Sequence, residues 1–200
     1  MKKKLPIGIQ TFCEIREDDY YYVDKTPFAL QLAEQGKYYF LSRPRRFGKS
    51  LFLDTLKELF EGNEPLFRGL YIHDKWDWNI KYPVIRISFG GGVLGFRKEL
   101  DATLHHHLAL HEERLSLTQV FPDIRSRFAD LIRRAAEQAG QRVVILVDEY
   151  DKPILDNLEN PDAAREMREA LRDFYSVIKD SDAHVKFAFL TGVSKFSKVS

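Results

Sequence analysis

The 200 residues are enough for one α/β domain with a sizeable core, and 44% hydrophobic with 30% charged residues excludes a disordered or fibrous chain. The net charge of +1 gives no general attraction to nucleic acid or an anionic membrane, so any phosphate affinity must be local. The single cysteine excludes an intrachain disulfide, and no apolar run approaches the about 18 residues of a membrane span. The basic start lacks the apolar core of a signal peptide, so we expect a cytoplasmic protein without membrane contact.

Hydrophobic periodicity and turn residues predict the elements of the first half. Thr26 and Pro27 form a helix start, with threonine as N-cap and proline at the first helical position. The expected order is an irregular lead-in over 1–26 with a possible short strand at 20–23, a helix over 27–35, a short buried strand over 38–41, a loop over 42–48, a helix over 49–61 and a loop over 63–82 with at most a short helical turn.

The second half predicts a regular alternation of strands and helices. The expected order is a strand over 84–89, helices over about 94–114 and 122–139, a buried central strand over 143–147, a helix over 161–178 and a strand over 185–190. This alternation favours one α/β domain over residues 1–200, with a mostly parallel sheet and helices on both faces. Because no helix follows the last strand, we expect this to be the N-terminal part of a longer polypeptide.

A candidate phosphate-binding loop lies between the strand at 38–41 and the helix that follows it. Gly48, Lys49 and Ser50 match the end of G-x-x-x-x-G-K-[ST], but Arg43 stands where the first glycine is expected. In such a loop, backbone N–H groups and a helix N-terminus converge on an anion, the lysine reaches the phosphates and the serine hydroxyl ligates Mg²⁺. A basic surface turn that happens to contain these three residues is the alternative.

An acidic pair ends the predicted central strand. Asp148 is placed to hold the Mg²⁺ shell, and Glu149 to orient and deprotonate an attacking water. Either residue alone fits an N-cap or a solvated turn. The loop and the pair occur in the correct order, each after its own strand, and this combination favours nucleotide binding over chance.

Thr191 follows the last predicted strand. In P-loop proteins with a catalytic glutamate beside the acidic aspartate, a polar residue at the tip of the neighbouring strand contacts the γ-phosphate or the water. Thr191 stands where that sensor is expected. The alternative is an ordinary threonine at the end of a strand.

Four segments together resemble the predicted AAA-ATPase-like family: YYYVDKT at 20–26, SRPRRFGKS at 42–50, VILVDEYDKPI at 144–154 and FLTGVSKFSKVS at 189–200. The resemblance covers nearly the whole chain. It implies an AAA/RecA-like P-loop NTPase fold, and in this family P-R-R-F-G-K-S is the usual phosphate loop. Family members often carry a further C-terminal domain similar to PD-(D/E)XK nucleases, which these residues do not include.

The resemblance implies the roles of individual residues. Lys49, Glu149 and Thr191 fall on catalytic positions, and Ser50 and Asp148 on positions that bind the metal. The expected nucleotide-binding residues are Arg45, Arg46, Phe47, Gly48, Lys49, Ser50 and Leu51. Two points stay open. Arg45 and Arg46 bind phosphate or pair with Asp151 or another acid, and the signature Asp24-Lys25-Thr26 lies near the nucleotide or caps a helix.

The expected function is Mg²⁺-dependent ATP hydrolysis that drives a conformational change. A non-hydrolysing nucleotide-binding switch and an ATPase module of a nucleic-acid-processing protein are the alternatives. No residue of the chain is identified as an arginine finger, so a second copy, another partner or the remainder of a longer polypeptide is expected to supply one. Nucleic acid is expected as a partner only through a further C-terminal domain.

Overall fold

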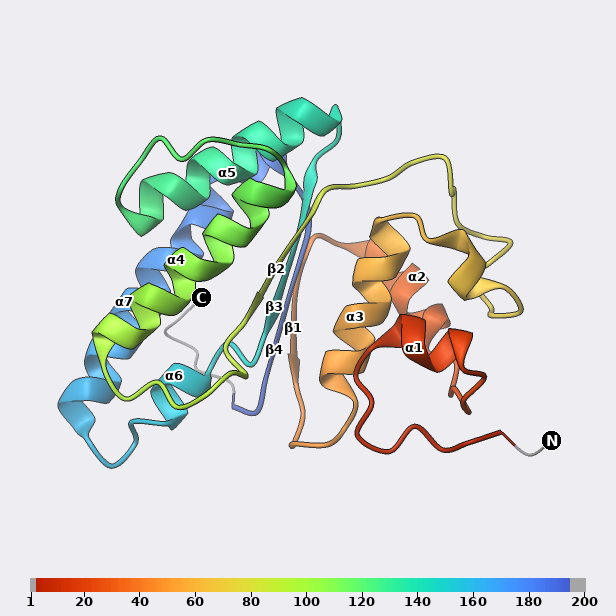
Figure 1. The fold of residues 1–200 in the computed structure, drawn as a ribbon, viewed down its shortest axis with the longest axis horizontal. Helices are drawn as coiled ribbons and strands as arrows, with labels where there is room; N and C mark the ends of the chain where they lie inside the picture. The colour runs from red at the N-terminus through yellow and green to blue at the C-terminus, as the bar shows by residue number, and fades with distance from the viewer. Residues whose placement is uncertain (1–2, 195–200) are drawn as a thin grey trace.

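The computed structural model describes residues 3–194, which form a four-stranded parallel sheet with helices on both faces (Figure 1). The strand order is β1-β4-β3-β2, and all three neighbouring pairs are parallel. The elements, in chain order, are α1 (Phe12–Glu17), α2 (Thr26–Gln35), β1 (Tyr38–Ser42), α3 (Lys49–Phe60), the 3-10 helix η1 (Glu64–Phe67), β2 (Val84–Ser88), α4 (Arg97–Arg114), α5 (Ile124–Ala139), β3 (Val143–Asp148), α6 (Lys152–Leu155), α7 (Pro161–Asp180), the 3-10 helix η2 (Asp182–His184) and β4 (Val185–Gly192).

The sheet separates two hydrophobic layers. Every residue of β3 is buried, and alternate side chains of this strand point to opposite faces. Val143, Ile145 and Val147 pack with α4, α5 and α7, whereas Val144 and Leu146 pack with α1, α2 and α3. Figure 1 shows the same division, with the two sets of helices on either side of the sheet. The prediction of a parallel α/β fold with helices on both faces is therefore confirmed.

Three expectations about the elements were wrong. The lead-in contains the helix α1, whose buried Phe12 and Ile15 pack into the second layer, and residues 20–23 contribute only an isolated bridge between Tyr20 and Lys4. The short helix α6 was also missed. The strand β1 is not buried as expected, because it lies at the edge of the sheet and leaves Tyr38 44% exposed.

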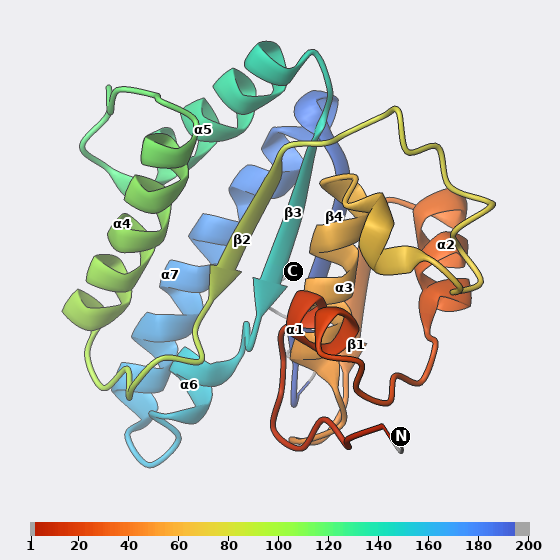
Figure 2. The ribbon, with the colours of Figure 1, turned by 45° about the vertical axis from the view of Figure 1, so that its right-hand side comes forward.

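The carboxyl ends of the four strands lie at one edge of the sheet, because all the strands run in the same direction. In Figure 2 this edge is at the lower end of the sheet, where the segment after β2, the segment after β3 and the loop from β1 to α3 all lie. Ligands of open α/β sheets bind at this edge. Among the residues that the structure describes, no helix is long and apolar enough to cross a membrane.

Candidate functional site

The loop from Arg43 to Gly48 turns sharply before α3 begins at Lys49. Arg46 and Gly48 both adopt the left-handed region, with φ of 67° and 72°, which glycine tolerates and other residues rarely adopt. Lys49 is only 7% exposed, and its ammonium donates to the carbonyl oxygens of Arg43 and Pro44, each at 2.9 Å. The lysine therefore closes the loop on itself. This contact holds the turn at the position where the first glycine of the general pattern is replaced by Arg43.

The acidic pair lies at the end of β3, on the turn into α6. Asp148 is 4% exposed, and Glu149 is half-buried with a φ of 53°. A left-handed conformation in a glutamate carries local strain of order 1 kcal/mol or more. It rotates Glu149 out of the strand direction. Its carboxylate Oε2 lies 3.5 Å from the place that a Cβ on Gly90 would occupy, and therefore beside the end of β2.

Thr191 joins the acidic pair to the neighbouring strand β4. Its hydroxyl donates to Asp148 Oδ1 at 2.6 Å and accepts from the Glu149 backbone N–H at 3.4 Å. The side chain is fully buried, so little water competes with these bonds. Because β4 is the neighbour of β3 in the sheet, Thr191 lies at the tip of the strand beside the acidic pair, the position expected from the sequence.

Backbone hydrogen bonds connect the loop to the acidic pair through the end of β4. The N–H of Arg43 donates to the Gly192 carbonyl at 3.1 Å, and the N–H of Tyr150 donates to the Thr191 carbonyl at 2.9 Å. Gly192 has no room for a side chain, because a Cβ there would lie 2.6 Å from Asp151 Oδ1. The ends of β1, β4 and β3 thus form one rigid row. These residues belong to motifs that are far apart in the sequence.

Asp151 has a different role from the one considered in the sequence. Instead of pairing with a loop arginine, its carboxylate accepts the backbone N–H groups of Val193 at 2.9 Å and Ser194 at 2.6 Å. It is 1% exposed and fixes the segment that leaves β4. Over residues 3–194, neither Arg45 nor Arg46 forms an ion pair, and both are exposed. Within this part of the chain, the pairing of a loop arginine with Asp151 or another acid is therefore not found.

The signature Asp24-Lys25-Thr26 lies at the start of α2, but Thr26 is not the N-cap that the sequence predicted. Lys25 is the N-cap, and Thr26 is the first helical residue. Asp24 accepts from the Thr26 backbone N–H at 2.8 Å and from the Thr26 hydroxyl at 2.6 Å. Its other oxygen accepts from the Tyr71 N–H at 2.7 Å. Asp24 and Thr26 thus attach the start of α2 to the segment before β2.

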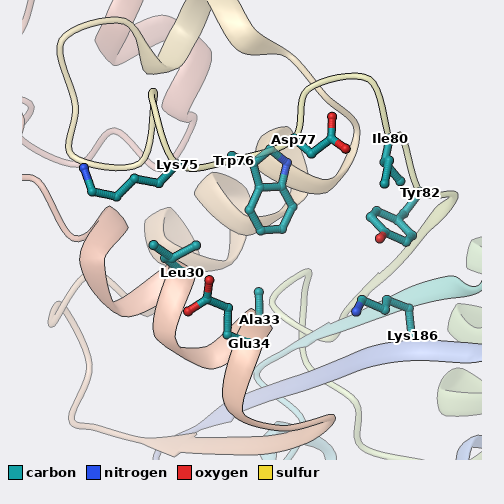
Figure 3. A pocket seen from close by; sticks show the side chains of 9 residues that line it. All are labelled: Leu30, Ala33, Glu34, Lys75, Trp76, Asp77, Ile80, Tyr82 and Lys186. Atoms are coloured by element: carbon teal, nitrogen blue, oxygen red, sulfur yellow. The ribbon is translucent and has the colours of Figure 1, made fainter.

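A separate hollow of about 190 Å³ opens between α2 and the segment before β2 (Figure 3). Trp76, Tyr82 and Leu30 face it, with Lys186 at one end. Lys186 is the second residue of β4, so this hollow lies towards the amino ends of the strands. It is therefore distinct from the edge where the loop and the acidic pair meet. Over residues 3–194, no group of three or more histidine, cysteine, aspartate or glutamate side chains is arranged to hold a metal ion by itself.

Comparisons with known proteins identify a family for the chain. A model of the family described as "Predicted AAA-ATPase" matches residues 6–200. The chain is also similar to a protein from Azotobacter chroococcum mcd 1 described as "Uncharacterized protein in vnfD 5'region", with 66% identity over 200 residues. That match covers 100% of this chain and 39% of the relative. No solved structure matches the chain. The chain belongs to the predicted AAA-ATPase-like family, and its parallel sheet fits the P-loop fold.

Proposed function

We propose that the chain binds ATP with Mg²⁺ and hydrolyses it, and that hydrolysis drives a conformational change. One observation carries this proposal. Thr191 of β4 lies between the two motifs, bonded to Asp148 at 2.6 Å, while Gly192 beside it accepts the first N–H of the phosphate loop at 3.1 Å. Segments far apart in the sequence therefore supply a phosphate loop, an acidic pair and a strand-tip hydroxyl at one edge of the sheet.

The phosphate chain would lie in the loop. Backbone N–H groups at the start of α3 would bind an anion there, and the left-handed Gly48 would allow the backbone to approach it closely. Lys49 would exchange its two carbonyl partners in the loop for phosphate oxygens. Arg45 and Arg46, with Phe47, Ser50 and Leu51, complete the proposed binding set.

Ser50 and Asp148 are the proposed metal-binding residues. Hydroxyl and carboxylate oxygens are the donors that Mg²⁺ prefers. Asp148 has one carboxylate oxygen available for the ion. Its Oδ1 accepts from Thr191, whereas Oδ2 has no hydrogen-bond partner over residues 3–194. The donor set therefore fits the ion. When bound, Mg²⁺ neutralises charge that develops on the phosphates.

Glu149 is the proposed general base. The left-handed turn places its carboxylate beside the end of β2 and outside the buried row that Asp148 occupies. From there it would accept the proton of the attacking water. Thr191 holds Asp148 and the Glu149 backbone in place, and its hydroxyl is the proposed contact with the γ-phosphate or the water.

The test compares wild type with Lys49→Ala and Glu149→Gln in nucleotide binding and in ATP hydrolysis. We expect Lys49→Ala to lose ATP binding, and Glu149→Gln to bind ATP while its turnover falls by roughly 100-fold, because only the proton acceptor is removed. Calorimetry measures binding, and phosphate release measures turnover.

Lys179→Ala and Glu169→Gln are the matched controls, since both side chains are exposed on α7. Equal hydrolysis by wild type, Lys49→Ala and Glu149→Gln would contradict the assignment. Tight ATP binding by wild type with no phosphate release, even in the intact protein, would instead support the non-hydrolysing switch.

The chain spans 39% of the length of its relative from Azotobacter chroococcum. What is proposed here about partners therefore concerns the whole protein and not these residues alone. We propose that an arginine from a second copy or from another partner completes the site, because arginine stabilises the charge of phosphoryl transfer. Hydrolysis would then rise with protein concentration or on addition of the partner.

A further inference from the structure

Lys25 lies beside the phosphate loop, although 23 positions separate it from Gly48 in the sequence. Its ammonium is 3.6 Å from the place that a Cβ on Gly48 would occupy, and no other heavy atom outside the adjacent residues comes within 4 Å of that point. Gly48 directly precedes Lys49. The two lysines therefore flank the same short piece of backbone. Lys25 is the N-cap residue before α2, and Lys49 is the first residue of α3.

The position of Lys25 is fixed by its two neighbours in the chain. Thr26 is fully buried, and its hydroxyl accepts the Ile72 N–H at 3.2 Å while donating to Asp24. Asp24 accepts the N–H groups of Thr26 and Tyr71. Burial raises the pKa of Asp24, but these hydrogen bonds from Thr26 and Tyr71 outweigh it and hold the pKa below its usual value. The backbone at Lys25 is thus anchored on both sides.

The Lys25 ammonium has no protein partner within residues 3–194, neither a carboxylate nor a hydrogen-bond acceptor. The adjacent carboxylate of Asp24 forms no ion pair with Lys25, and its oxygens instead accept from Thr26 and Tyr71. A lysine that is held by an anchored backbone, lies beside the proposed phosphate loop and has no counter-ion among the described residues is arranged for an anionic ligand.

We propose that Lys25 is a second phosphate-binding lysine, which contacts the phosphate chain of the bound nucleotide from the side of Gly48. The proposal rests on the nucleotide binding proposed above and adds the N-cap residue of α2 to the site. It also assigns separate roles within one signature: Asp24 and Thr26 fix the backbone, and Lys25 binds the ligand.

The experiment measures the affinity of ATP, ADP and adenosine for the intact protein by calorimetry, with Mg²⁺ present. Lys25→Met removes the charge and keeps the length of the side chain. We expect it to weaken ATP binding by roughly ten-fold or more, the usual effect of one charge-assisted hydrogen bond. Adenosine, which has no phosphate, binds both proteins equally. Lys25→Arg restores part of the affinity for ATP.

Lys179→Met is the matched control, because it removes one exposed lysine near the end of α7, next to the amino end of β4. Equal ATP affinity in wild type and Lys25→Met, or an equal loss in Lys179→Met, would overturn the proposal and leave nucleotide binding intact. If wild type binds no ATP, the proposed function fails and this proposal fails with it. Circular dichroism of Lys25→Met confirms that the variant is folded.

Discussion

At the scale of single residues, the site depends on one buried hydroxyl. Thr191 Oγ1 donates to Asp148 and accepts from the Glu149 N–H, so it sets the positions of both acidic residues. Neither contact can be predicted from the presence of a threonine at this position of the sequence. Glu149 also has a left-handed φ of 53°, which glutamate rarely adopts. The surrounding contacts must therefore hold the turn against the conformational preference of this residue.

Thr191→Val removes the hydroxyl and keeps the shape of the side chain. We expect it to destabilise the protein by about 1–3 kcal/mol, because Asp148 Oδ1 is left buried without its donor. We also expect ATP turnover to fall more than ATP affinity. Denaturant unfolding measures the first effect, and steady-state kinetics the second.

Thr191→Ser is the matched control, since it keeps the hydroxyl and should stay close to wild type in both measurements. A valine variant with wild-type turnover would show that the hydroxyl has no role in the reaction.

At the scale of elements, α3 connects the candidate phosphate loop to the rest of the molecule. Lys49 and Ser50 begin this helix, and Asp54 follows them by about one turn. Asp54 is 5% exposed, accepts the Phe12 N–H of α1 at 2.7 Å and pairs with Arg86 of β2 at 2.6 Å. One carboxylate therefore attaches the helix of the loop to both α1 and the sheet.

Asp54→Asn should destabilise the protein by about 2–4 kcal/mol, because it leaves the Arg86 guanidinium without its partner in a mostly buried position. Thermal or urea unfolding measures the change. The control is Asp173→Asn, which breaks the exposed pair with Arg125, where the side chains are 60% and 49% exposed. Exposed pairs contribute at most about 1 kcal/mol. Similar losses in the two variants would contradict the role assigned to Asp54.

The histidines of α4 have a structural role at the edge of the sheet. His111 Nε2 lies 3.0 Å from the N–H and 2.8 Å from the carbonyl of Arg86, and His107 contacts the Ser88 carbonyl at 2.8 Å. These contacts cover the open edge of β2, which otherwise presents unpaired backbone groups.

At the scale of the whole molecule, His111 links stability to pH. Its pKa is lowered to about 4, mainly by burial and to a smaller extent by the nearby Arg114 and His107. The hydrogen bond to the Arg86 carbonyl and the charge of Glu61 oppose this shift only in part. The unfolded chain takes up a proton at this site below its ordinary pKa of 6.5, but the folded protein does so only near 4. Stability is therefore complete above pH 6.5 and is lost as the pH falls towards 4.

We expect this histidine to reduce the free energy of unfolding by up to about 3 kcal/mol between these two pH values. Burial also lowers the pKa of His107, which acts in the same direction. Urea unfolding of wild type and His111→Gln from pH 7 to pH 4 measures the difference. The variant should lose less stability on acidification, whereas His106→Gln, at an exposed position on the same helix, should behave as wild type does. Identical pH profiles for wild type and His111→Gln would exclude this origin of the acid sensitivity.

Much of the fold could be predicted from the chain because its local signals are strong. The apolar run of β3, Asn160 as the N-cap of α7 with Pro161 behind it, and Gly140 after α5 each placed an element correctly. Asn160 accepts the Ala163 N–H at 3.2 Å, as an N-cap does. The short helices α1 and α6 were missed, because six and four residues are too few for a periodic pattern to be recognised.

The sequence by itself determined the residue types of the candidate site, because Gly48-Lys49-Ser50, Asp148-Glu149 and Thr191 each follow a recognisable strand. Only the tertiary structure decided which strands are neighbours. Parallel strands are joined by crossovers, so chain order does not give spatial order, and the insertion of β4 between β1 and β3 brings Thr191 to Asp148. The same holds for Lys25, which reaches Gly48 because the Asp24 and Thr26 contacts fix the start of α2 against a distant segment.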